Sequence, residues 1–133
     1  MDFDQLKALS SVKYQQSQHA LAKITAREAE LRAELDRMRS LVVETQSQPP
    51  EHAQMRAIGA DVIWLSWVGQ VQKQLNITLA QVLAQKERHM ASHKEIHGKK
   101  LVSDQLAADH ATKRQKELQE KRLRTAIDGT LMR

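Results

Sequence analysis

Apolar residues recur along the first part of the chain at alternating steps of three and four positions. The positions on this stripe are Leu21, Ile24, Glu28, Leu31, Leu35, Met38 and Val42. Such spacing places side chains on one face of a helix and keeps that face toward a partner helix. Glu28 is the single charged position on the stripe. The pattern predicts a first helix from about residue 4 to about residue 46.

A polar segment that contains both prolines of the chain, Pro49 and Pro50, follows this stripe. A proline inside a helix removes a hydrogen bond and clashes with the preceding turn, and the residue before it avoids helical angles. The first helix therefore has to end by about Gln48, and a turn is predicted over about residues 47–58. The next helix has two acceptable starts, one at Pro50 and a later one capped by Asp61.

A second periodic pattern predicts a helix from about residue 59 to about residue 128. One line of positions at heptad spacing runs through Val68, Leu75, Val82, His89 and Ile96. A line beside it holds Trp64, Trp67, Val71 and Leu79. Further along, the same seam reads Lys100, Ser103 and Ala107, so it becomes weak and polar.

Two helices joined by one short break are expected to fold back antiparallel. The predicted fold class is therefore all-α, a long antiparallel two-helix coiled-coil hairpin formed as a single domain over residues 1–133. With the turn centred near residue 53, everything after about Ala107 lacks a partner in the same chain. This leaves an unpaired C-terminal helical extension of about 25 residues, or roughly 35–40 Å. A lone polar helix of this length is marginal in water, so it is either frayed or made for another protein.

Composition supports a long helical protein and shows a basic second half. Aromatic residues make up 3% of the chain, cysteine is absent, and strong helix formers dominate. The net charge of +5 is uneven, because residues 67–133 carry 13 basic and 7 acidic side chains. The basic tail consists of Lys113, Arg114, Lys116, Lys121, Arg122 and Arg124. Such a tail suits an acidic partner, nucleic acid or an anionic membrane surface, or is an ordinary solvated helix.

The sequence contains no arrangement typical of catalysis or cofactor binding. His89, His93 and His97 share one helix face, but cysteine is absent and a fourth metal ligand is missing. We therefore interpret them as a polar stretch of the seam and predict no metal and no cofactor. The serines lie in helical or linker contexts without a nucleophile elbow, and the four glycines form no phosphate-binding loop. The chain is therefore predicted not to be an enzyme.

The segment Val62–Val68, which carries both tryptophans, is the best candidate for a binding surface. Trp64 and Trp67 lie in a chain with one Phe and one Tyr besides them. Both tryptophans fill the hairpin core in the simplest interpretation, but two helices can hardly cover both. One of them is expected to anchor an interface, because tryptophan is enriched among the residues that dominate binding energy.

These features resemble the FliJ/YscO family, small basic proteins of flagellar and related type III export systems. The resemblance lies in Trp64, Trp67, Val71 and Leu75 at the start of the second helix and in Leu31, Leu35, Met38 and Val42 on the first. The family line includes aromatic residues on its first helix, and a histidine is common where this chain has Thr78. The resemblance implies a non-catalytic antiparallel two-helix coiled coil, similar to the γ-subunit stalk of rotary ATPases.

The function expected from this resemblance is that of a stalk or coupling protein of a flagellar or type III protein export apparatus. The export-gate membrane protein would be contacted by Leu35, Met38, Val42, Trp64, Trp67, Val71 and Leu75, and the export ATPase ring by the basic end. No small-molecule substrate is expected, and the expected location is cytoplasmic, peripheral to the inner membrane at most.

Two alternatives stay open. One is a basic helical module that binds nucleic acid, although its tail has no aromatic residue for stacking, and the other is a general coiled-coil adaptor or export chaperone.

Overall fold

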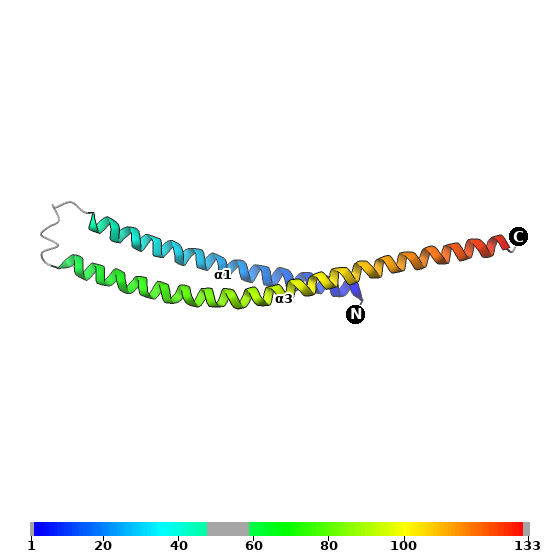
Figure 1. The fold of residues 1–133 in the computed structure, drawn as a ribbon, viewed down its shortest axis with the longest axis horizontal. Coiled ribbons are helices and arrows are strands. Elements are labelled where there is room, and N and C mark those ends of the chain that lie inside the picture. Colours follow the sequence, from blue (N-terminus) through cyan, green and yellow to red (C-terminus); the bar gives the residue numbers. More distant parts are fainter. Residues whose placement is uncertain (1, 48–58, 132–133) are drawn as a thin grey trace. The chain divides into compact units, whose positions relative to one another are not determined.

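The computed structural model of this chain describes residues 2–47 and 59–131. These residues form two α-helices, α1 (Phe3–Gln46) and α3 (Ala60–Leu131), and contain no strand (Figure 1). The all-α prediction is thereby confirmed. The observed helix ends fall within about three residues of the expected ones, and the expected turn lies almost wholly outside the described residues. Within the described residues, neither helix offers an apolar stretch sufficient to traverse a lipid bilayer.

Local hydrogen bonds at the helix starts explain where the two helices begin. The Gln5 backbone N–H donates to Asp2 Oδ1 (2.7 Å) and the Asp2 N–H donates to Gln5 Oε1 (3.3 Å), so the two residues cap α1 reciprocally. At the start of α3, Gly59 has a φ of 79°, a conformation that other residues adopt only with strain. Asp61 lies in the first turn of α3, where its carboxylate accepts the Val62 N–H (3.1 Å) near the positive end of the helix dipole.

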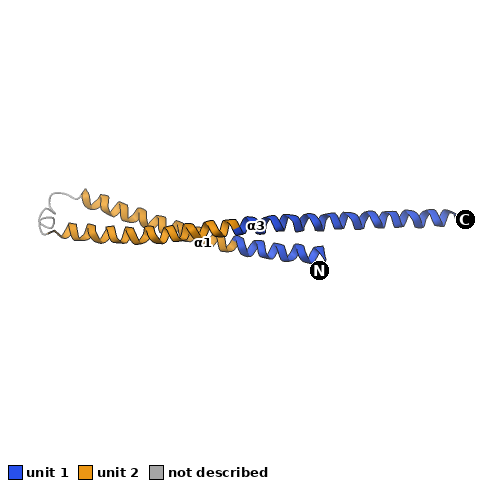
Figure 2. Cartoon of the chain, turned by 60° about the horizontal axis from the view of Figure 1, so that its bottom comes forward, with its two compact units in different colours: residues 1–18, 92–133 blue, residues 19–91 orange. Residues whose placement is uncertain are grey.

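The chain divides into two compact units, which are described separately (Figure 2). Unit 2 (His19–Ala91) contains the later part of α1 and the first part of α3. Unit 1 (Met1–Gln18 and Ser92–Arg133) contains the start of α1 and the rest of α3. Within each unit the two helical segments lie side by side and run antiparallel, as the hairpin prediction requires (Figures 1 and 2).

An apolar seam holds the two segments of unit 2 together. The buried cluster on this seam consists of Ile24, Leu31, Leu35, Leu79 and Val82, with Leu75 packed against it. Leu31 is the most completely covered member, with 2% of its surface exposed. Burying one such leucine contributes about 1.5–3 kcal/mol relative to leaving it in water. Together with Met38 and Val68, this cluster makes up the buried apolar residues of the described part of unit 2, and it stabilises the pairing of the two helices there.

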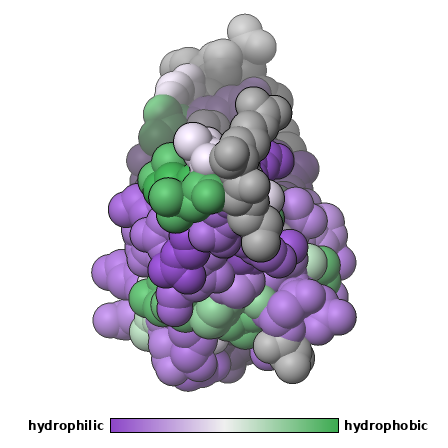
Figure 3. All heavy atoms as spheres, turned by 90° about the vertical axis from the view of Figure 1, so that its right-hand side faces the viewer, coloured by the Kyte–Doolittle hydropathy of each residue, from purple (hydrophilic) through white to green (hydrophobic). Residues whose placement is uncertain are grey.

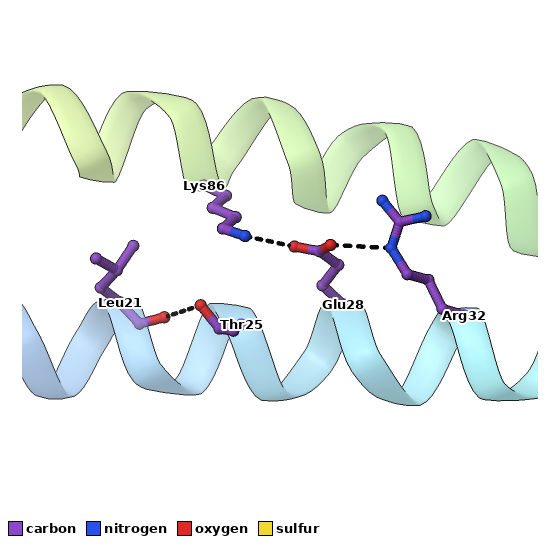
Figure 4. Close-up of polar contacts among 5 residues, drawn as sticks. All are labelled: Leu21, Thr25, Glu28, Arg32 and Lys86. Carbon is purple, nitrogen blue, oxygen red and sulfur yellow. Dashed lines mark hydrogen bonds and ion pairs between the residues drawn. The ribbon is translucent and has the colours of Figure 1, made fainter.

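One ion pair crosses this apolar seam, and it occupies the charged position of the predicted stripe. Glu28 of α1 receives a hydrogen bond from Lys86 Nζ on α3 (2.8 Å) and another from Arg32 Nε one turn along α1 (2.9 Å) (Figure 4). The Glu28 side chain is 14% exposed, so water screens these contacts only partly. The hydrogen bond from Lys86, followed by the one from Arg32, lowers the pKa of the Glu28 carboxyl below its ordinary value of 4.5.

The seam of unit 1 is mainly polar. Ser10 Oγ lies 2.9 Å from Ser103 Oγ, and Ser17 Oγ lies 2.9 Å from His93 Nδ1. The ring of Tyr14 lies between these two hydrogen bonds and contacts the His93 ring at 5.1 Å between centroids. Each such polar contact is worth about 0.5–1.5 kcal/mol net, less than the burial of a leucine. Unit 1 is therefore held more weakly per contact than unit 2.

The last 21 described residues of α3 have no packing partner within the described chain. Phe3 packs on His110, with 5.1 Å between ring centroids, and His110 is the last residue of α3 that is not fully exposed. Every residue from 111 to 131 is exposed, and all of them are helical. We call residues 111–131 the C-terminal extension.

Replacing Leu31 with alanine is expected to destabilise the hairpin by about 2–4 kcal/mol, because it opens a cavity in the buried cluster. The measurement is urea unfolding followed by far-UV circular dichroism. Val43→Ala is the matched control on the same helix, because Val43 is exposed, and it should change the free energy of unfolding by less than about 0.5 kcal/mol. Equal effects of the two changes would contradict the assigned core.

The contribution of Glu28 to stability should depend on pH in a defined direction. Because its pKa is lower in the folded chain than the ordinary 4.5, the contribution is present above pH 4.5 and is lost as the pH falls through the folded pKa. Glu28→Gln removes this charge and leaves Lys86 and Arg32 in place. The difference in melting temperature between the original chain and E28Q should therefore shrink between neutral pH and about pH 3. A pH-independent difference would argue against the ion pair.

Candidate interaction surfaces

The predicted partner-binding residues on α1 lie mostly in the core of unit 2. Leu35 and Met38 are 4% and 5% exposed, so in the closed hairpin they have almost no surface to offer a partner. Val42 is half-buried on the same face. The physical reason is that all three continue the stripe of Leu31, which faces α3. These side chains position the hairpin, and only Val42 retains area for an outside contact.

The predicted residues on α3 fall into two groups. Trp64, Val71 and Leu75 are half-buried on the seam side of the helix, and Leu75 covers the buried cluster. Trp67, in contrast, is 52% exposed. Trp67 comes three residues after Trp64, and this step rotates it off the seam. The two tryptophans therefore have different environments, and Trp67 is the one available to a partner.

Trp67 belongs to an exposed apolar face of unit 2 that the sequence reading did not define. Ile63 and Ile77 are exposed as well, and steps of four, three, four and three connect Ile63, Trp67, Gln70, Gln74 and Ile77 on one side of α3. We call these five residues the Trp67 face. The signal was present in the sequence, because Ile63 and Ile77 are apolar residues at positions outside the seam.

The six basic residues of the predicted tail all lie on the C-terminal extension, and all are exposed. Within the described part of the chain, none of them lies within 4.0 Å of a carboxylate oxygen. Their charges are therefore available to an outside partner, and the apolar side chains between them, such as Leu118 and Leu123, are exposed too. In the view of Figure 3 most of the visible surface is hydrophilic, and hydrophobic residues form small separate patches.

The histidines that share a face in the sequence are engaged in packing where the structure describes their contacts. His93 forms a hydrogen bond with Ser17 through Nδ1, and the rings of His93 and His97 both contact the Tyr14 ring at a tilt. His89 belongs to unit 2 and is half-buried. Among residues 2–47 and 59–131, no group of three or more His, Cys, Asp or Glu side chains is arranged to hold a metal ion.

Unit 1 contains an apolar groove that sequence reasoning missed. The groove has a volume of about 710 Å³. It is lined by Leu6, Leu9, Ser10 and Lys13 of α1 and by Glu95, Ile96, Gly98, Lys99, Val102, Ser103 and Leu106 of α3. Leu9, Val102 and Leu106 on its walls are exposed. A search for apolar residues off the polar seam would have found these three.

Comparison with known protein families, curated proteins and solved structures gives no significant match.

The different environments of the two tryptophans can be measured by acrylamide quenching of fluorescence. Trp64→Phe leaves the exposed Trp67 as the only tryptophan, and Trp67→Phe leaves the half-buried Trp64. The W64F protein should be quenched with a clearly larger Stern–Volmer constant and emit at a longer wavelength than the W67F protein. Equal quenching of the two proteins would contradict the placement of Trp67 outside the seam.

Proposed function

We propose that the chain is a non-enzymatic stalk and coupling protein of a flagellar or type III protein export apparatus, with α1 and α3 packed as a coiled coil. The proposal is carried by the antiparallel hairpin of unit 2. The positions that resemble the FliJ/YscO lines meet on this hairpin, with Leu31, Leu35 and Met38 in the seam and Trp67 on its surface.

In this proposal the Trp67 face contacts the membrane protein of the export gate. Its tryptophan and Ile63 lie one turn apart and supply a small apolar patch. The amides of Gln70 and Gln74, which separate this patch from Ile77, can hydrogen-bond at its edge. Interfaces of this kind depend on one or two buried aromatic anchors surrounded by polar contacts. Trp67 is the exposed aromatic residue of unit 2 and is therefore the expected anchor.

The C-terminal extension contacts the export ATPase in this proposal. Its six basic side chains have no carboxylate partners in the described chain, so their charge is free to steer the helix to an acidic surface. A helix that has no packing partner gains the most order from such a contact, because it is marginal alone in water. The role is mechanical and regulatory: one asymmetric helical protein acts on a ring of identical subunits, and the reacting groups belong to the ATPase.

The test is to purify the chain with an ATPase of the export class and to measure both binding and the rate of ATP hydrolysis. The proposal expects a complex on size-exclusion chromatography and faster hydrolysis in its presence. Separately, the chain should bind the soluble part of the export-gate protein. Absence of binding to both partners would rule out the proposal.

Trp67→Ala should weaken binding to the gate protein by at least about tenfold, since truncating a hot-spot residue costs about 2 kcal/mol or more. Leu83→Ala is the matched control, because Leu83 is exposed on the opposite side of α3 in unit 2. Both variants should keep the helicity of the original chain. A loss of helicity in W67A would assign Trp67 to the core instead.

Binding of nucleic acid is the second candidate, and the exposed basic side chains of the extension favour it. It predicts DNA or RNA binding that weakens steeply with salt and disappears when residues 113–133 are removed. The extension offers no aromatic side chain for stacking on bases, so the export proposal is preferred.

A further inference from the structure

A line of exposed residues on α3 reads the same from both ends. Its positions are Gly98, Val102, Leu106, Asp109, Lys113, Lys116, Glu120, Leu123, Ile127 and Leu131. Successive steps are three or four residues, so the line follows one side of the helix. The order is three small or apolar residues, an acid, two bases, an acid and three apolar residues. All ten residues belong to unit 1 and all are exposed.

The two apolar ends of this line have matching geometry. Gly98, Val102 and Leu106 lie on the wall of the apolar groove, and Leu123, Ile127 and Leu131 form an exposed stripe on the C-terminal extension. Each residue of the stripe follows its counterpart in the groove by about 25 residues, which is close to seven helical turns of 3.6 residues. The groove wall and the stripe therefore lie on the same side of α3.

The line has apolar residues at both ends and charged residues in its middle, so two copies that lie antiparallel bring the apolar end of each to the apolar end of the other. When two such helices lie antiparallel about a two-fold axis, each groove receives the apolar stripe of the other copy, so both patches are covered in one closed assembly. An amphipathic helix with anchors at i, i+4 and i+8 is also the shape that fits an apolar groove. The groove is lined by two helices, so each end of the assembly becomes a three-helix contact.

Charge favours the antiparallel arrangement over a parallel one. The C-terminal extension carries six basic and three acidic residues, whereas residues 92–110 carry three of each. In the antiparallel register given below, residues 123–131 lie beside the partner's residues 102–110, and the two extensions overlap only over residues 111–122. Parallel pairing would place the two basic extensions side by side over their whole length. In the middle of the line, a displacement of one turn puts Glu120 beside the partner's Lys113 on both sides of the axis. This register also puts Leu106 opposite the partner's Ile127.

We propose that two copies of this chain associate antiparallel through unit 1, each placing the Leu123, Ile127 and Leu131 stripe of its C-terminal extension in the other's apolar groove. The patches are small, so the dimer is weak and forms at high local concentration. The inference goes beyond the proposed function. It adds a state in which the extension is covered by a second copy and is not free for an ATPase.

Sedimentation of the full chain from about 1 µM to about 1 mM measures this association. The original chain should change from monomer to dimer within this range. Val102→Glu in the groove and Ile127→Glu on the stripe should each raise the dissociation constant at least about tenfold, because each buries a charge in the contact. A chain that stays monomeric throughout, or a dimer unaffected by either change, would overturn the proposal.

Two matched controls separate the contact from a general effect of added charge. Leu101→Glu changes an exposed leucine next to Val102 that does not line the groove. Leu118→Glu changes an exposed leucine of the extension that lies two and a half turns from Ile127, on the opposite side of the helix. L101E and L118E should dimerise like the original chain. If they disrupt the dimer as strongly as V102E and I127E, the proposed face is wrong.

The absence of cysteine allows the register to be tested by disulfide formation. Proteins with Leu106→Cys and Ile127→Cys are mixed and oxidised. The two positions are roughly 30 Å apart on one rigid helix, so they cannot join within one chain. The mixture should give a covalent dimer of L106C with I127C, whereas L106C mixed with Leu118→Cys should give little. Crosslinking confined to I127C with itself would contradict the antiparallel register.

These experiments need only the chain itself, so their failure leaves the proposed function untouched, and the failure of ATPase binding leaves the dimer untouched.

Discussion

The apolar seam of unit 2 is the contact on which the rest of this chain depends. A hairpin of two helices has a single internal interface, so nearly all of its apolar burial has to come from one narrow stripe on each helix. In unit 2 this burial comes from the buried residues Ile24, Leu31, Leu35 and Met38 of α1 and Val68, Leu79 and Val82 of α3. Unit 1 has serine and histidine contacts in the equivalent positions, and Oδ1 of Asp104 there is buried without a hydrogen-bond partner in the described chain. Stability is therefore expected to fall from unit 2 to unit 1 and further to the C-terminal extension.

An apolar stripe alone does not define one alignment of two helices, because sliding by a heptad places leucine on leucine again. Glu28 limits this ambiguity. It reaches Lys86 across the seam and Arg32 along its own helix, and a slide by one heptad toward Leu79 would leave its carboxylate against an apolar side chain. A polar residue in an otherwise apolar seam is a well-documented way to fix register at some cost in stability.

Most of the fold could be predicted from the sequence, because proline positions and apolar spacing are local signals. The prolines at 49 and 50 mark the interruption, and the spacing of apolar residues marks the seam of α1. The surfaces were harder to predict. A straight helix has 3.6 residues per turn, whereas a heptad repeat assumes 3.5. The buried side of α3 therefore drifts around the helix, and it includes both Thr78 and Leu79. Pattern reading alone therefore did not separate Trp67 from the seam, nor did it reveal the groove, which needs α1 and α3 side by side.

The surfaces described above share one physical property, which is that no other part of the described chain covers them. Two packed helices shield only the side chains that lie between them. The Trp67 face, the groove and the C-terminal extension all present apolar side chains that the two described helices leave in contact with solvent.

The graded stability of the chain is the most direct test of this account. Hydrogen exchange followed by mass spectrometry, at a concentration too low for self-association, measures it segment by segment. The account predicts the slowest exchange in the paired helices of unit 2, faster exchange over residues 3–18 and 92–110, and the fastest helical exchange over residues 111–131. Exchange in unit 2 as fast as in residues 111–131 would contradict it.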